Sequence, residues 1–174
     1  NNISGLNRGI DVNATGAGDI TLKAASGTTI SARDTTNGKA IEVSSLGGNI
    51  EIGNSTTGCG AALTGGYGID ASTTSSGTIN MKLDASITAT GYTALSTSAV
   101  SGNTRVDIGS NATISGATFA IISRNGTGTV TINNAGTVSG RLSAQGTGAR
   151  TFNNYGTLKI ASGLANNGFY VNNL

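Results

Sequence analysis

Three carboxylate residues are the first candidates for chemistry in this sequence. Asp11, Glu42 and Asp70 each stand between two apolar residues, as in the triplet Ile10-Asp11-Val12. Paired carboxylates can cleave glycosidic bonds by acid–base chemistry, and clustered carboxylate oxygens bind hard cations such as Ca²⁺. The three residues therefore predict a polysaccharide-active site or a weak metal site, with ordinary solvated positions as the plainer alternative.

The remaining composition restricts the chemistry. The sequence has no His, which removes His-based catalytic triads and the most common general base. It has no paired Cys/His metal motif and no phosphate-binding GxxxxGK[ST] loop. We expect no aromatic platform beside the carboxylates, and we expect no cofactor. Catalysis is therefore the weaker of the hypotheses.

A second set of candidates consists of hydroxyl residues on either side of a single aliphatic residue, as in Thr-Ile-Ser. The candidate binding residues of this set are Thr29, Ser31, Thr88, Thr113, Ser115, Thr137 and Ser139. Thr and Ser pair well across strands, so the pattern fits either strand-forming surface residues or an extended polar contact surface. Regular hydroxyls are also typical of some ice-binding solenoids, but Ser, Ala and Lys interrupt the pattern here.

Tyrosines and one cysteine complete the candidates. Tyr67 and Tyr92 precede corresponding apolar triplets, and we expect them to stack on the surface as contact residues. Tyr155 and Tyr170 are candidates for contact or for covering apolar corners. Cys59 is the only cysteine and cannot form an internal disulfide. We expect it to be a small corner side chain, with a reactive or intermolecular thiol as the alternative.

A repeat identifies the elements that position these residues. Residues 125–140 recur as residues 145–160, with eight of the sixteen pairs identical. Such a period indicates stacked coils rather than a globule, and here the coils shorten from roughly thirty residues to roughly twenty. Apolar–polar–apolar triplets bury one side of a strand. The Gly and Asn residues between them favour turns.

Three columns of short strands are expected, one strand of each in every coil. The first column starts at Ile10, Ile41, Ile69, Leu95 and Ile121. The second starts at Ile20, Ile50, Ile79, Val106 and Val130 and continues to Phe152. The third is centred on Ile30, Leu63, Ile87, Ile114, Val138 and Leu158. The sequence therefore predicts an all-β parallel β-helix of triangular section, with about five to six coils and a length of roughly 25–30 Å.

Stacking the coils aligns outward side chains into ladders. The three carboxylates would lie about 5 Å apart and repel one another. Arg8, Lys39 or Lys23, a bound cation or splayed side chains should offset this repulsion. Asn pairs are expected at corners, where they would hydrogen-bond along the rod. These pairs are Asn133-Asn134, Asn153-Asn154, Asn166-Asn167 and Asn172-Asn173.

The charge is small and unevenly distributed. The chain has 174 residues and a formal net charge of +2, and only 10% of its residues are charged. No carboxylate follows Asp107, whereas Arg124, Arg141, Arg150 and Lys159 do. Four cations over the 67 residues that follow Asp107 make a weak electrostatic field, so we expect no nucleic-acid partner. Residues 1–174 are interpreted as one β-helix segment, a piece of a longer protein.

The phrases from Thr129 to Gly140 and from Phe152 to Leu158 resemble the degenerate coils of bacterial autotransporter passenger domains, which use the type V secretion system. The resemblance covers about residues 8–170 and concerns the style of the repeat. It implies a right-handed parallel β-helix that is exported to the bacterial cell surface or released. It also implies an outer-membrane β-barrel elsewhere in the full-length protein.

Three functions remain open. The first is an adhesin or self-association rod that contacts host-cell surface or matrix molecules, or another copy of itself, through polar faces. The second is a polysaccharide-active enzyme that uses Asp11, Glu42 and Asp70. The third is a toxin-like or haemolysis-assisting passenger. Weak contacts along one face gain strength from repetition, so the first function is preferred.

Overall fold

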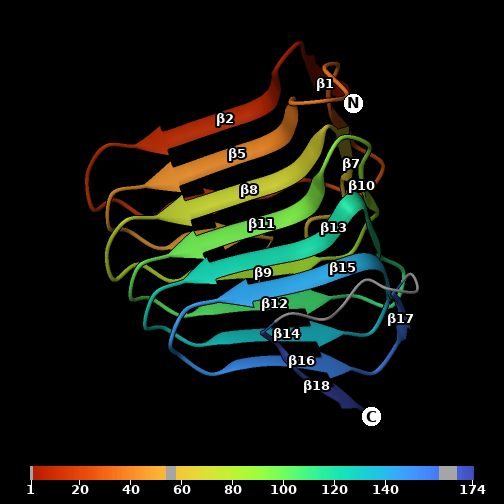
Figure 1. Cartoon of the computed structure of the whole chain (residues 1–174). Coiled ribbons are helices and arrows are strands. Elements are labelled where there is room, and N and C mark those ends of the chain that lie inside the picture. Colours follow the sequence, from red (N-terminus) through yellow and green to blue (C-terminus); the bar gives the residue numbers. More distant parts are fainter. Residues whose placement is uncertain (1, 54–57, 161–167) are drawn as a thin grey trace.

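The computed structural model describes residues 2–53, 58–160 and 168–174. Over these residues the chain is all-β and winds as a right-handed parallel β-helix (Figure 1). Every strand pair whose register is given is parallel, and each strand pairs with the corresponding strand of the coil before or after it. The fold class predicted from the triplet columns is confirmed.

The three columns form the three faces of the rod. The first face contains β2 (Arg8–Ala14), β5 (Lys39–Ser45), β8 (Tyr67–Thr73), β11 (Thr93–Ala99) and the second halves of β13 (Thr113–Asn125) and β15 (Thr137–Gln145). The second face contains β3 (Ile20–Leu22), β6 (Ile50–Ile52), β9 (Ile79–Leu83), β12 (Thr104–Ile108), β14 (Val130–Asn134), β16 (Arg150–Asn154) and β18 (Tyr170–Asn173). The third face contains β1 (Asn2–Gly5), β4 (Thr29–Ala32), β7 (Ala62–Gly65), β10 (Ile87–Ala89), the first halves of β13 and β15, and β17 (Thr157–Lys159).

The coil number agrees with the prediction of five to six. The described residues form six coils, namely β1–β3, β4–β6, β7–β9, β10–β12, β13–β14 and β15–β16. β17 and β18 extend the third and second faces into the next turn of the rod. β13 and β15 pass round the corner between the third and first faces as continuous strands, with register shifts near Phe119. The shorter coils at this end therefore lack a separate corner loop.

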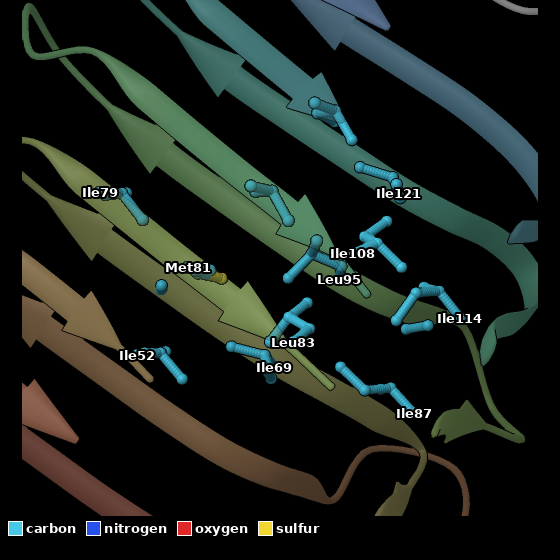
Figure 2. Packing of buried hydrophobic residues seen from close by; sticks show 14 of the residues in the cluster. Ile52, Ile69, Ile79, Met81, Leu83, Ile87, Leu95, Ile108, Ile114 and Ile121 are labelled. Carbon is cyan, nitrogen blue, oxygen red and sulfur yellow. The ribbon is translucent and has the colours of Figure 1, made fainter. Parts of the chain in front are cut away.

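Aliphatic stacks fill the rod. On the first face, Ile41, Ile69, Leu95 and Ile121 occupy one register, and each is fully buried. Figure 2 shows Ile69, Leu95 and Ile121 facing the interior that Ile79, Leu83 and Ile114 enter from the other two faces. Each such burial contributes about 1.5–3 kcal/mol. Successive coils thus share one continuous core, which explains how a chain so poor in aromatic residues holds together.

The predicted register of the second face is wrong by two residues at β12. Thr104, not Val106, is the partner of Ile79 and of Val130, so Val106 lies beside Met81. Thr104 is 2% exposed, and its hydroxyl exchanges hydrogen bonds with the side chain of Asn125 at 3.0–3.2 Å. An inward position that the triplet pattern assigns to an aliphatic residue is therefore polar. The shift of two leaves the inside and outside of the strand unchanged.

Glycines form a column at the corner between the first and second faces. Its members are Gly18, Gly48, Gly77, Gly102, Gly128 and Gly148. A Cβ on any member from Gly48 onward would overlap the carbonyl oxygen of the preceding member. None of these six has a positive φ. Glycine was expected between the strands because it tolerates the positive φ of turns, and that reason is wrong for this column. Glycine is required here because neighbouring coils approach too closely for a Cβ.

The Asn pairs build two ladders on the second face rather than standing at corners. Each pair ends a strand, so its two side chains point to opposite sides of the sheet. The outward ladder joins Asp107, Asn133, Asn153 and Asn172 by amide hydrogen bonds of 2.6–2.9 Å. The inward ladder joins Asn134, Asn154 and Asn173 at 2.7 and 3.2 Å. The predicted structural role is confirmed for these pairs, and Asn166-Asn167 lies outside the described residues.

Candidate functional site

The three predicted carboxylates do line up on the first face. Asp11, Glu42 and Asp70 share one outward register on β2, β5 and β8. Lys39 lies between the last two, with its Nζ 2.5 Å from Glu42 Oε1 and 2.6 Å from Asp70 Oδ2. Arg8 bridges the first two in the same way, 3.4 Å from Asp11 Oδ2 and in direct contact with Glu42. We call these five residues the ion-pair ladder.

The ladder resolves the expected repulsion between the carboxylates. Of the three cations proposed to offset it, Arg8 and Lys39 do so. Lys23 does not, because it lines a hollow at the corner between the second and third faces. Partial burial of Glu42 opposes its ionisation, but hydrogen bonds from Lys39 and Arg8 outweigh this and lower the pKa of Glu42. The ladder is therefore an alternation of fixed charges.

An aromatic column continues the line of cations along the rod. The rings of Tyr67 and Tyr92 have centroids 5.7 Å apart, and those of Tyr92 and Phe119 are 5.5 Å apart. The guanidinium of Arg141 lies over the Phe119 ring, 4.7 Å from its centroid, which is a favourable cation–π distance. Tyr67 is in register with Lys39. We call these four residues, Tyr67, Tyr92, Phe119 and Arg141, the aromatic column.

The aromatic column confirms one expectation and corrects another. Tyr67 and Tyr92 stack as predicted. The expectation of no aromatic platform beside the carboxylates is wrong, because Tyr67 on β8 lies in register beside Lys39 of the ion-pair ladder on β5, and its ring packs on Tyr92. The sequence did not indicate Phe119 as a site residue, and it indicated Arg141 only as one of the cations that follow Asp107. The available signal was position: Tyr67 and Phe119 each stand two residues before a buried first-face aliphatic, as Lys39 does.

The hydroxyl residues of the third face form one long row. Ser4, Ser31, Thr64, Thr88, Ser115 and Ser139 follow one another in register, and Lys159 ends the row. A neighbouring row contains Thr113, Thr137 and Thr157, but Ala62 stands beside Thr29 at the other end of it. The predicted candidates thus lie on one face, and the interruption by Ala falls at Ala62, in the neighbouring row, so the row through Thr64 is unbroken.

The other candidates do not join these surfaces. Cys59 is 2% exposed, and its backbone N–H donates to the carbonyl of Lys82. Desolvation by burial raises the pKa of its thiol. Tyr155 and Tyr170 are 58% and 71% exposed. Within the described residues, no three His, Cys, Asp or Glu side chains gather in a metal-binding arrangement.

Comparisons with known proteins add no relative. A scan against models of protein families finds no match. A search of curated proteins finds no match, and a search of solved structures finds none either. Over the described part of the chain, no helix has the length and apolar character needed to cross a membrane. What this protein does must therefore be argued from its own surfaces.

Proposed function

We propose that this chain is an adhesive rod, exported by the type V route and displayed at or released from a bacterial cell surface. It contacts a second copy of itself, or host surface and matrix molecules, through the hydroxyl row of its third face. The observation that supports this is the continuity of the row: six coils present a hydroxyl at one register, from Ser4 to Ser139.

The dimensions of the third face indicate how such a rod would act. A strip three residues wide and six coils long covers only about 300 Å² at ordinary strand dimensions. A stable pairwise interface needs roughly 800 Å² from each partner. One rod therefore binds another weakly, and useful strength comes from many rods acting together on one surface. This is the situation of a protein displayed in many copies.

The first face offers less support for the alternative of a polysaccharide-active enzyme. A glycosidase needs one carboxyl group that stays protonated to donate to the leaving oxygen. Glu42 is held between two cations, which lower its pKa and keep it ionised. No particular contact favours a toxin-like role, so neither alternative is proposed.

The test uses beads coated densely with the 174-residue chain. The variant Thr64→Lys/Thr88→Lys places charges on two exposed positions of the hydroxyl row. We expect wild-type beads to clump, or to bind matrix-coated surfaces, and the variant beads to lose most of this adhesion. The matched control, Thr15→Lys/Thr127→Lys, adds the same charge at exposed positions away from the third face, at the corner between the first and second faces. Equal adhesion of variant and wild type, or dispersed wild-type beads that bind no matrix, would refute the proposal.

A further inference from the structure

We propose that the C-terminal half of the first face binds an acidic carbohydrate chain, one that carries carboxylate or sulfate groups. The site consists of Tyr92, Phe119 and Arg141 of the aromatic column, together with Arg124 and the adjoining corner of the rod. Apart from Ser139 and Lys159 at that corner, which also end the hydroxyl row, its residues lie on the first face. The proposal therefore does not depend on the adhesive function proposed above.

The C-terminal half of the first face carries positive charge that no carboxylate of the described residues matches. In the N-terminal coils, Arg8 and Lys39 are matched by the carboxylates of the ion-pair ladder. Arg124 and Arg141 lie further along the same face, where the sequence has no acidic residue beyond Asp107. No ion pair joins either of them to a carboxylate within the described residues. This end of the face therefore attracts anions.

In the part of the chain that the structure describes, the guanidinium of Arg141 is held in place by Phe119 rather than by a carboxylate. Its Nε is buried and has no hydrogen-bond partner among the described residues, although its guanidinium lies on the Phe119 ring. The buried Nε is closed to an incoming anion, but the guanidinium is already oriented, and its two terminal nitrogens can donate two parallel hydrogen bonds to a carboxylate or sulfate. A bound anion would supply the charge partner that the protein itself does not provide.

A corner hollow extends the site. It has a volume of 340 Å³, and its lining includes Thr118, Ser139, Gly140 and Lys159. The hollow adjoins the aromatic column, because the backbone N–H groups of Thr118 and Phe119 both donate to the carbonyl of Tyr92. Thr118 and Ser139 carry hydroxyls and Lys159 an ammonium group, and Gly140 of the same lining directly precedes Arg141 in the sequence. These groups suit a sugar with hydroxyl and anionic substituents.

The aromatic rings favour a sugar over a nucleic acid. Sugars combine apolar C–H surfaces, which pack on aromatic rings, with hydroxyls that form hydrogen bonds. Tyr92 is 37% exposed and can make both kinds of contact. Bases instead need open ring faces on which to stack. Here the neighbouring rings are tilted or edge to face, at interplanar angles of 46° and 61°, and Arg141 lies over one face of Phe119, so they do not form a row of parallel open faces for successive bases.

The experiment measures binding of the purified chain to immobilised polygalacturonate, which carries carboxylates, and to chondroitin sulfate, which carries both groups. Neutral dextran and oligo-dT serve as comparison surfaces. We expect affinity for at least one acidic glycan that falls as salt is added, and little retention on dextran. Comparison of the two acidic surfaces reports whether sulfate is required. Equal retention on dextran, or tighter binding to oligo-dT, would overturn the proposal.

The decisive variant is Arg124→Gln/Arg141→Gln, for which we expect binding at least about tenfold weaker. The matched control is Arg33→Gln/Arg105→Gln, which removes the same charge elsewhere, and it should stay within about twofold of wild type. Because Arg141 packs on Phe119, the exposed single variant Arg124→Gln provides a reading that does not depend on this contact. Equal losses in the variant and the control would mean general charge attraction and would refute a site on the first face.

Discussion

Replacing one member of the glycine column tests the packing of the coils directly. In Gly102→Ala the new Cβ would overlap the carbonyl group of Gly77, and the carbonyl oxygen of Ser76 lies 2.8 Å away. These are backbone atoms, so no side-chain rotation relieves the contact and the two coils must separate locally. Gly102 does not have a positive φ. A glycine that served only as a turn residue at this position would accept alanine readily.

The expected loss follows from two opposing effects. Overpacking of a close contact costs about 1–3 kcal/mol. Removing a glycine stiffens the unfolded chain and restores about 0.4–1 kcal/mol. The upper part of the first range applies because backbone must move, which leaves a net loss of about 2 kcal/mol. For a chain of this size that loss lowers Tm by roughly 4–8 °C.

The assay is thermal and urea unfolding followed by circular dichroism. The matched control is Gly16→Ala, since no atom lies within 4 Å of a Cβ at Gly16 and its φ is not positive. We expect this control to be neutral or more stable than wild type by up to about 1 kcal/mol. If Gly102→Ala unfolds at the same midpoint as Gly16→Ala, the close-approach explanation of the column is wrong.

Three further predictions concern the ladder, the buried network and the thiol. The pKa of Glu42 is lowered from 4.5, so its contribution to stability is complete above that pH and is lost as the pH falls through the folded value. The difference in unfolding free energy between wild type and Glu42→Gln should therefore shrink as the pH falls from about 6 to about 3, and a constant difference would contradict the ladder. Asn125→Ala strands the buried hydroxyls of Thr104 and Ser123 and should cost about 1–3 kcal/mol in urea unfolding, whereas the exposed Asn80→Ala should cost little. Cys59 should react with a thiol reagent far more slowly in the native protein than in guanidinium, and equal rates would show that its corner is open.

The fold was predictable because its signal repeats. Each triplet such as Ile10-Asp11-Val12 is weak by itself, but several at a common spacing specify a column. The first and third columns have the predicted registers, from Ile10 with Ile41 to Val138 with Leu158. The hydroxyl row and the carboxylate alignment followed directly, because outward residues are placed once the inward ones are known.

The wrong predictions concern residues whose positions depend on contacts between coils rather than on the spacing of apolar residues. Thr104 faces inward because Asn125 supplies a hydrogen-bonding partner from the next coil, and no pattern within one coil contains that information. The glycine column depends on backbone distances between coils. Phe119 was missed because it stands outside the buried triplet, on a strand that bends round a corner.

The parallel pairing of the coils also decides how the rod responds to force. Hydrogen bonds such as Ile50 N–H to Thr78 O and Ile79 N–H to Asn103 O run from coil to coil, along the rod axis. A pull between the two ends of the rod therefore opens these bonds in sequence, one coil after another, instead of shearing a whole sheet at once. Each released coil of about 25 residues adds roughly 80–90 Å of extended chain. A surface-tethered molecule of this kind would lengthen under load in small steps and shorten again by rewinding.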